Sequence, residues 1–167
     1  MKHIGIRQLV GIAASVALVV IAAPLFAGSS TTQTITFSVN AINEIAVSGN
    51  PGALTVSTAT PGSVPDTATD SSTTYDITTN QSGQKITAAI DSGMPAGVTL
   101  KVQLTAPAGA TSAGLVTLGA SAADVVTGIS TLNQSGLGIT YKLSATPAAG
   151  SMASDTRTVT LTITSGS

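Results

Sequence analysis

The sequence predicts an all-β protein, a single antiparallel β-sandwich of seven to nine strands with an immunoglobulin-like or jelly-roll-like arrangement. Three observations predict this class. Apolar residues recur at every second position along most of the chain, Thr and Ser fill many of the positions between them, and turn signals rich in Gly and Pro separate the runs. Such half-buried strands with short connections are typical of antiparallel sheets that pack face to face.

The first 27 residues are expected to be a Sec signal peptide rather than part of the fold. Three basic residues open the chain: Lys2, His3 and Arg7. An apolar run follows at 9–23, and Ala27 offers a small residue before the cut. Pro24 and the absence of a basic cluster after the run favour cleavage over a retained membrane helix. We therefore expect a secreted, extracellular protein that begins at Gly28.

The expected strands follow the alternating runs in chain order. These runs cover residues 34–39, 54–56, 75–79, 85–90, 98–104, 115–118, 137–143 and 156–164. The last run alternates most regularly, because Val159, Leu161 and Ile163 share one face while threonines take the other. Residues 57–74 have few apolar positions and are expected to form a loop.

One short helix is expected near residues 121–129. Ser121 has the side chain of a helix N-cap, and Gly128 is a typical helix stop. The domain plan is therefore a signal peptide at 1–27, an N-terminal strand at 28–40 and a sandwich domain at 41–167.

The composition argues against an enzyme and against a cofactor. The one histidine, His3, lies in the signal peptide, and the chain has no cysteine. Catalytic triads, cysteine nucleophiles and ordinary zinc sites need those residues. The aromatic residues beyond the signal, Phe37, Tyr75 and Tyr141, all occupy alternating positions that indicate core. We therefore expect no catalytic residue and no cofactor-binding residue.

Charge is sparse and shows no basic patch. Two of the six Lys and Arg residues, Lys2 and Arg7, belong to the signal, which leaves four against seven Asp and Glu residues. Nucleic-acid binding relies on clustered Lys and Arg, so we expect no nucleic-acid partner, and no membrane association after signal cleavage. A surface rich in Thr and poor in charge suits a protein that packs against copies of itself.

Asp66, Asp70 and Asp76 are candidates for a calcium site. They cluster in a Ser/Thr-rich stretch, and carboxylate oxygens are the ligands that calcium prefers. Their spacing does not match an EF-hand, and Asp in such a stretch commonly serves turn geometry instead.

The first alternating run raises the main functional question. Ile35, Phe37 and Val39 lie on one face of a strand that follows a short polar leader. Two interpretations remain open. The run is either the first strand of its own sandwich, or a donor strand that adds to a neighbouring copy of the chain. In the second case these three residues form the polymerisation strand.

The layout resembles that of small secreted pilin and biofilm-fibre subunits. The shared features are a Sec signal, an alternating strand soon after the cut, one sandwich rich in Ala, Thr and Gly, and a closing alternating strand. The resemblance implies a structural subunit of an extracellular fibre, pilus or biofilm matrix. Its partners would be copies of itself and an export or assembly machinery. The alternative is a monomeric secreted adhesin or binding module of a cell-surface system.

Overall fold

The structure is a computed structural model that describes residues 28–166. The expected signal peptide at 1–27 lies outside the described residues. The chain divides into two units, residues 1–37 and residues 38–167. The strands all belong to the second unit, which is the sandwich domain.

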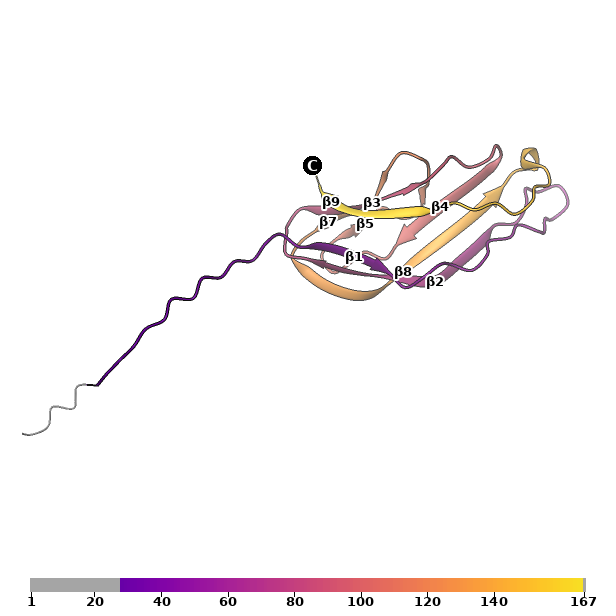
Figure 1. The fold of residues 1–167 in the computed structure, drawn as a ribbon. Coiled ribbons are helices and arrows are strands. Elements are labelled where there is room, and N and C mark those ends of the chain that lie inside the picture. Colours follow the sequence, from indigo (N-terminus) through magenta and orange to yellow (C-terminus); the bar gives the residue numbers. More distant parts are fainter. Residues whose placement is uncertain (1–27, 167) are drawn as a thin grey trace, which may run out of the picture. The chain divides into compact units, whose positions relative to one another are not determined.

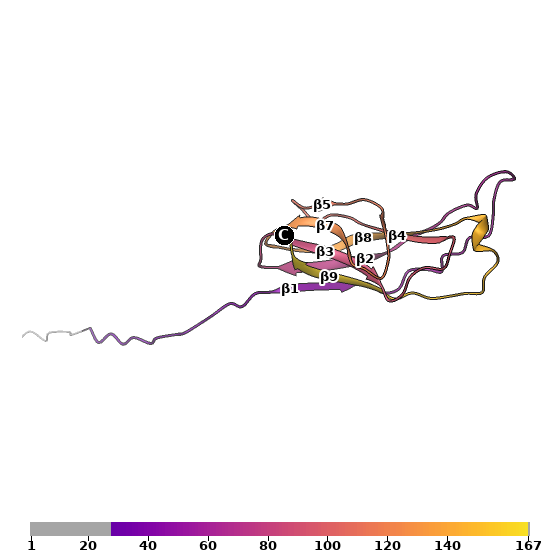
Figure 2. The ribbon, with the colours of Figure 1, turned by 90° about the horizontal axis from the view of Figure 1, so that it is seen from above.

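Two antiparallel sheets pack face to face in the sandwich domain (Figure 1), and a second view shows their edge strands β1 and β9 next to each other (Figure 2). The first sheet has the order β1 (Asn43–Val47), β2 (Ala68–Thr79), β8 (Leu132–Ala145), β4 (Val98–Leu104) and β6 (Val116–Thr117). The second has the order β5 (Thr111–Ser112), β7 (Ala123–Ile129), β3 (Gln84–Ile90) and β9 (Val159–Ser165). The prediction of an all-β sandwich is confirmed.

The core lies between the central strands of the two sheets. Alternate residues of β2, β3, β4 and β8 point inward, and the side chains of Ile86, Val102 and Ile139 are almost completely buried. Tyr75 is also buried, and its hydroxyl donates a hydrogen bond of 2.6 Å to the Thr105 carbonyl. Burial raises the pKa of Tyr75 to about 12.

The predicted helix near 121–129 is wrong, because this segment is strand β7. Its residues Val125, Val126, Thr127 and Ile129 are β-branched, which favours a strand. Two register shifts against β3 each give β7 one extra residue, so Val125 and Val126 both point into the core although they are consecutive. Gly128 has a φ of +74° beside one of these bulges. Because of the bulges, the buried residues of β7 do not recur at every second position, so the sequence of this strand shows no two-residue period. Within the described residues the helical structure is limited to one 3-10 turn, η1 (Pro147–Ala149).

Several strand boundaries also differ from the predicted ones. β3, β4 and β9 match the predicted runs to within about three residues at each end. The predicted loop at 57–74 is wrong in its second part, because β2 begins at Ala68. The predicted strands at 34–39 and 54–56 are not strands in this chain, and β1 was not predicted.

At the end of the sandwich where η1 lies, the loop that contains Gly97 packs closely against the segment 146–149. The Thr146 amide donates to the Gly97 carbonyl at 2.8 Å. Gly97 has a φ of +78°, and a Cβ built on it would lie 2.6 Å from the Ala149 nitrogen. Glycine is therefore required here both for its conformation and for space.

None of the helical structure in residues 28–166 is long and apolar enough to span a bilayer.

Candidate polymerisation site

The predicted polymerisation strand is exposed and forms no strand in this chain. The side chains of Ile35, Phe37 and Val39 are 78%, 87% and 79% exposed, more than those of any other large hydrophobic residue described. The expectation that Phe37 belongs to the core is therefore wrong, whereas Tyr75 and Tyr141 are buried as expected. Residues 28–42 have no ladder partner among the described strands. An extended segment that exposes apolar side chains and leaves its backbone unpaired has the properties of a donor strand.

The sandwich holds the chain just after this segment through Asn80. The Asn80 amide group donates to the Asn40 carbonyl at 2.8 Å, and its Oδ1 accepts from the Ile42 amide at 2.8 Å. The backbone N–H of Asn80 also donates, to the Ile42 carbonyl at 3.2 Å. Asn80 directly follows the last residue of β2. These bonds fix where the segment 34–39 leaves the domain.

The four edge strands differ in how well they are protected against pairing with another chain. β5 and β6 have two residues each, and β1 carries the charged Glu44. β9 has seven residues, no charge and no proline, and it pairs with β3 without a register shift. Long, regular, uncharged edges are the kind that recruit a further strand. β9 is therefore the longest regular and uncharged edge of the described domain, and part of it lies close to β1.

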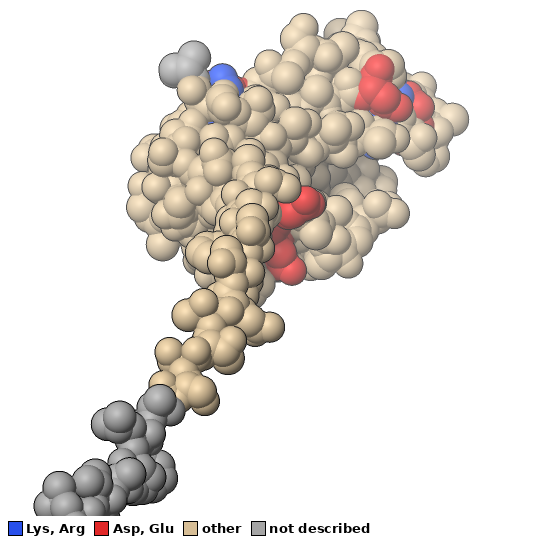
Figure 3. Space-filling view, turned by 60° about the vertical axis from the view of Figure 1, so that its left-hand side comes forward, with Lys and Arg blue, Asp and Glu red and all other residues tan. Residues whose placement is uncertain are grey.

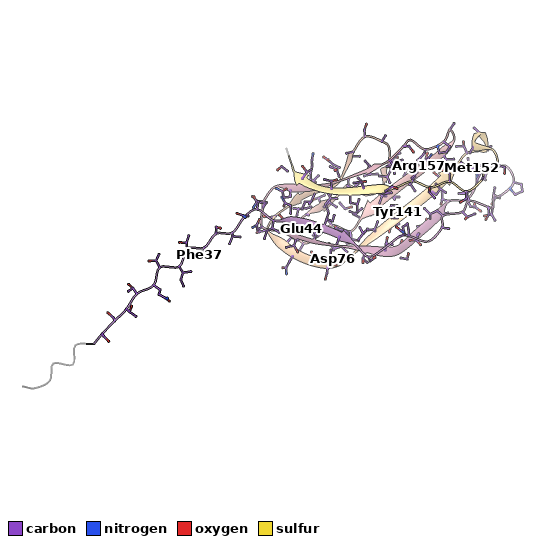
Figure 4. All side chains as sticks on the ribbon, viewed as in Figure 1. Phe37, Glu44, Asp76, Tyr141, Met152 and Arg157 are labelled. Atoms are coloured by element: carbon purple, nitrogen blue, oxygen red, sulfur yellow. The ribbon has the colours of Figure 1, made fainter. Side chains whose placement is uncertain are left out.

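A groove of about 720 Å³ opens near the start of β9. One wall is the segment 54–59, and the other is the segment 151–157, which runs directly into β9. The larger apolar side chains that line it, apart from prolines, are those of Leu54, Val56, Met94, Val98, Leu143 and Met152. Figure 4 shows Met152 and Arg157 at this end of the domain, with Glu44 toward the other end. The groove was not predicted from the sequence.

The walls of the groove carry free backbone groups. Within the described part of the chain, the amides and carbonyls of residues 54–57 and 151–154 make no hydrogen bond to other protein groups. The lining contains one charged pair, in which Arg157 donates to Asp155 at 2.8 Å. Hydrogen bonds from the Thr156 amide and from Arg157 lower the pKa of Asp155. The groove thus offers apolar surface and main-chain partners, and its charges are already paired.

Each of the three calcium candidates accepts hydrogen bonds from a different set of neighbouring groups. Asp66 accepts from the Thr58 hydroxyl at 2.7 Å, and Asp76 accepts from the Gly136 amide at 2.8 Å. Asp70 accepts from the amide and hydroxyl of Ser72, which lower its pKa. Residues 28–166 contain no group of three His, Cys, Asp or Glu side chains placed to hold a metal.

Charge is scarce on the surface of the domain. Figure 3 shows one face on which uncharged residues make up most of the surface. Lys85 pairs with Asp124 at 3.2 Å, while Lys101 and Lys142 lie directly opposite each other on β4 and β8. Little electrostatic repulsion therefore opposes close packing of two copies.

Comparison with protein-family models, curated proteins and solved structures finds no match.

Proposed function

We propose that this protein is a secreted structural subunit of an extracellular fibre, pilus or biofilm matrix, and that it self-assembles by β-strand addition. The segment 34–39 is the donor strand, which leaves its own domain and pairs with a neighbouring copy. Each copy donates one strand and accepts one, so the contact is head-to-tail and propagates a filament.

The observation that carries this proposal is the exposure of Ile35, Phe37 and Val39 at alternate positions. Complete burial of an Ile, Phe or Val side chain contributes about 1.5–3 kcal/mol, so the three together contribute roughly 5–9 kcal/mol before the cost of ordering the segment. In an isolated chain this free energy is not used. Main-chain hydrogen bonds to a partner would add both affinity and register.

The residue pattern of the segment supports strand addition rather than nonspecific hydrophobic association. Residues 34–39 alternate Thr or Ser with Ile, Phe and Val, as β9 alternates Thr with Val, Leu and Ile. A strand of this type fits the edge of a sandwich that is apolar on one side and polar on the other. The described domain also supplies a suitable edge, because β9 is long, regular and uncharged.

The test compares substitutions on the two faces of the segment in the mature chain. Phe37→Asp places a charge where an apolar contact is proposed and should abolish assembly. The matched control Thr36→Asp adds the same charge on the opposite face and should weaken assembly much less. Sedimentation velocity measures size, and negative-stain electron microscopy shows whether fibres form.

A wild-type protein that stays monomeric at high concentration and forms no fibres would contradict the proposal. That result would favour the alternative of a monomeric adhesin or binding module. Equal effects of Phe37→Asp and Thr36→Asp would contradict the assignment of the apolar face.

A further inference from the structure

The proposed donor strand needs an acceptor, and the structure offers a candidate at the end of the domain away from Asn80. We infer that the groove between the segments 54–59 and 151–157 receives residues 34–39 of a second copy of this chain. The inference rests on the proposed function and names its binding site.

Chain geometry argues that the occupant comes from another copy. Asn80 holds Asn40 at one end of β2, whereas the groove lies at the other end, where Ala68 pairs with the groove residue Leu143. The strand between these ends is 12 residues long, so the anchor and the groove are roughly 35 Å apart at about 3.3 Å per residue. Ile35 is five residues from Asn40 and can reach no further than about 18 Å from it.

This separation also gives the contact a direction. The donor leaves one end of the domain, and the acceptor opens at the opposite end. One contact between two copies uses one donor and one groove, and it leaves the donor of one copy and the groove of the other free. Repetition of the contact builds a linear polymer.

The chemistry of the groove fits the segment. Residues 28–40 carry no charged side chain. The two charged residues that line the groove, Asp155 and Arg157, pair with each other, so docking leaves no charge buried without a partner. Met94 and Met152 are flexible thioethers that adapt to an aromatic ring, and Phe37 is the aromatic residue of the segment. The groove volume of about 720 Å³ lies within the usual range for binding sites.

The backbone of the groove supports pairing with an extended segment. The free amides and carbonyls at 54–57 and 151–154 lie on its two walls. An added strand can hydrogen-bond to either wall, and the second wall continues into the regular, uncharged edge strand β9. Side chains at alternate positions could then contact apolar lining residues such as Met94, Val98 and Leu143.

A mixing experiment between two variants of the mature chain tests this inference. Phe37→Asp removes the donor and keeps the groove, whereas Met152→Asp damages the groove and keeps the donor. Met152 is 46% exposed, so the second change leaves the core intact. Each variant alone should stay monomeric. An equimolar mixture should form dimers and nothing larger, because one functional donor meets one functional groove.

The control variant is Thr127→Asp, which adds a charge at an exposed position of β7, away from the groove. It should assemble like the wild type. Circular dichroism of each variant shows that it is folded before it is mixed.

The outcomes separate the acceptor from the function. If wild type assembles and Met152→Asp assembles equally well, the groove is not the acceptor, while the proposed fibre function stands. If wild type does not assemble at all, the proposed function fails and this inference fails with it. A mixture that stays monomeric while wild type assembles also overturns the inference.

A covalent trap provides a second measurement that does not depend on weakened variants. Because the chain has no cysteine, an introduced pair has no competing thiol. Ile35→Cys combined with Val56→Cys or with Met152→Cys should give a ladder of disulfide-linked species on oxidation, since a disulfide needs Cα atoms within about 7 Å. Ile35→Cys combined with Thr164→Cys reports pairing at the far end of β9. Ladders formed only with position 164 would overturn the groove as acceptor.

Discussion

The bulges in β7 predict that truncating either of two consecutive valines destabilises the domain, which a regular strand would not predict. Val125 and Val126 are consecutive, yet both are fully buried. In a regular strand, one of two neighbouring side chains faces solvent and tolerates truncation. We therefore expect Val125→Ala and Val126→Ala to destabilise the domain by similar amounts.

The magnitude follows from the groups removed. Each change deletes two buried methyl groups, worth about 0.8 kcal/mol each in transfer free energy, and leaves a cavity that the packed core only partly closes. The expected loss is about 2–3 kcal/mol per variant. Thr127→Ala, at an exposed position of the same strand, should stay within about 0.5 kcal/mol of the wild type.

Urea unfolding monitored by far-ultraviolet circular dichroism measures these changes, since the chain has no tryptophan. With a slope of about 1–3 kcal/mol per molar urea, the midpoint should fall by roughly 1–2 M for each valine variant. If either valine variant unfolded at the same urea midpoint as the wild type, that result would refute the bulged register. A midpoint for Thr127→Ala as low as those of the valine variants would refute the assignment of its exposed face.

Three further predictions concern other parts of the domain. Gly97→Ala should lower the thermal midpoint far more than Gly109→Ala, because both glycines have positive φ values but only the Cβ at 97 would meet neighbouring atoms; equal shifts would contradict the close packing there. The pKa of Tyr75 is raised to about 12, so the stability that its neutral hydroxyl provides is complete below pH 10 and is lost as the pH rises from 10 to 12. Parallel titrations by absorbance at 295 nm and by circular dichroism should show Tyr75 ionising together with unfolding, and ionisation near pH 10 in a folded domain would contradict its burial. Leu161→Asp should lower the urea midpoint more than Thr160→Asp, because Leu161 is half-buried against the core and Thr160 is exposed; the reverse order would mean that β9 faces the other way.

The strands that the sequence predicts well are those with strict alternation. In β3, β4 and β9 the residues of one face are more buried than those of the other along most of the strand, so their period of two is visible in the residues themselves. The first half of β2 could not be found in this way, because Ala68 to Thr74 contains no large apolar residue. That half is held by pairing with β8, a partner about 70 positions away in the chain.

The candidate site is only partly visible in the sequence. Alternation identifies Ile35, Phe37 and Val39 as a strand-forming set, but it cannot say whether that set pairs within its own chain. The groove could not be predicted, because its walls have no regular ladder and bring Leu54 together with Met152 from distant parts of the sequence. Only the folded arrangement of the two sheets places these segments side by side.

Amide hydrogen exchange over residues 34–39 tests the central claim most directly, because it reports whether the backbone of this segment is paired. In the monomer these amides should exchange at rates typical of an unprotected chain, since residues 28–42 form no strand. In the assembled form the same amides should be protected, in the alternating pattern of an edge strand bonded on one side. Protection already present in the monomer, or assemblies in which this segment exchanges freely, would contradict the account.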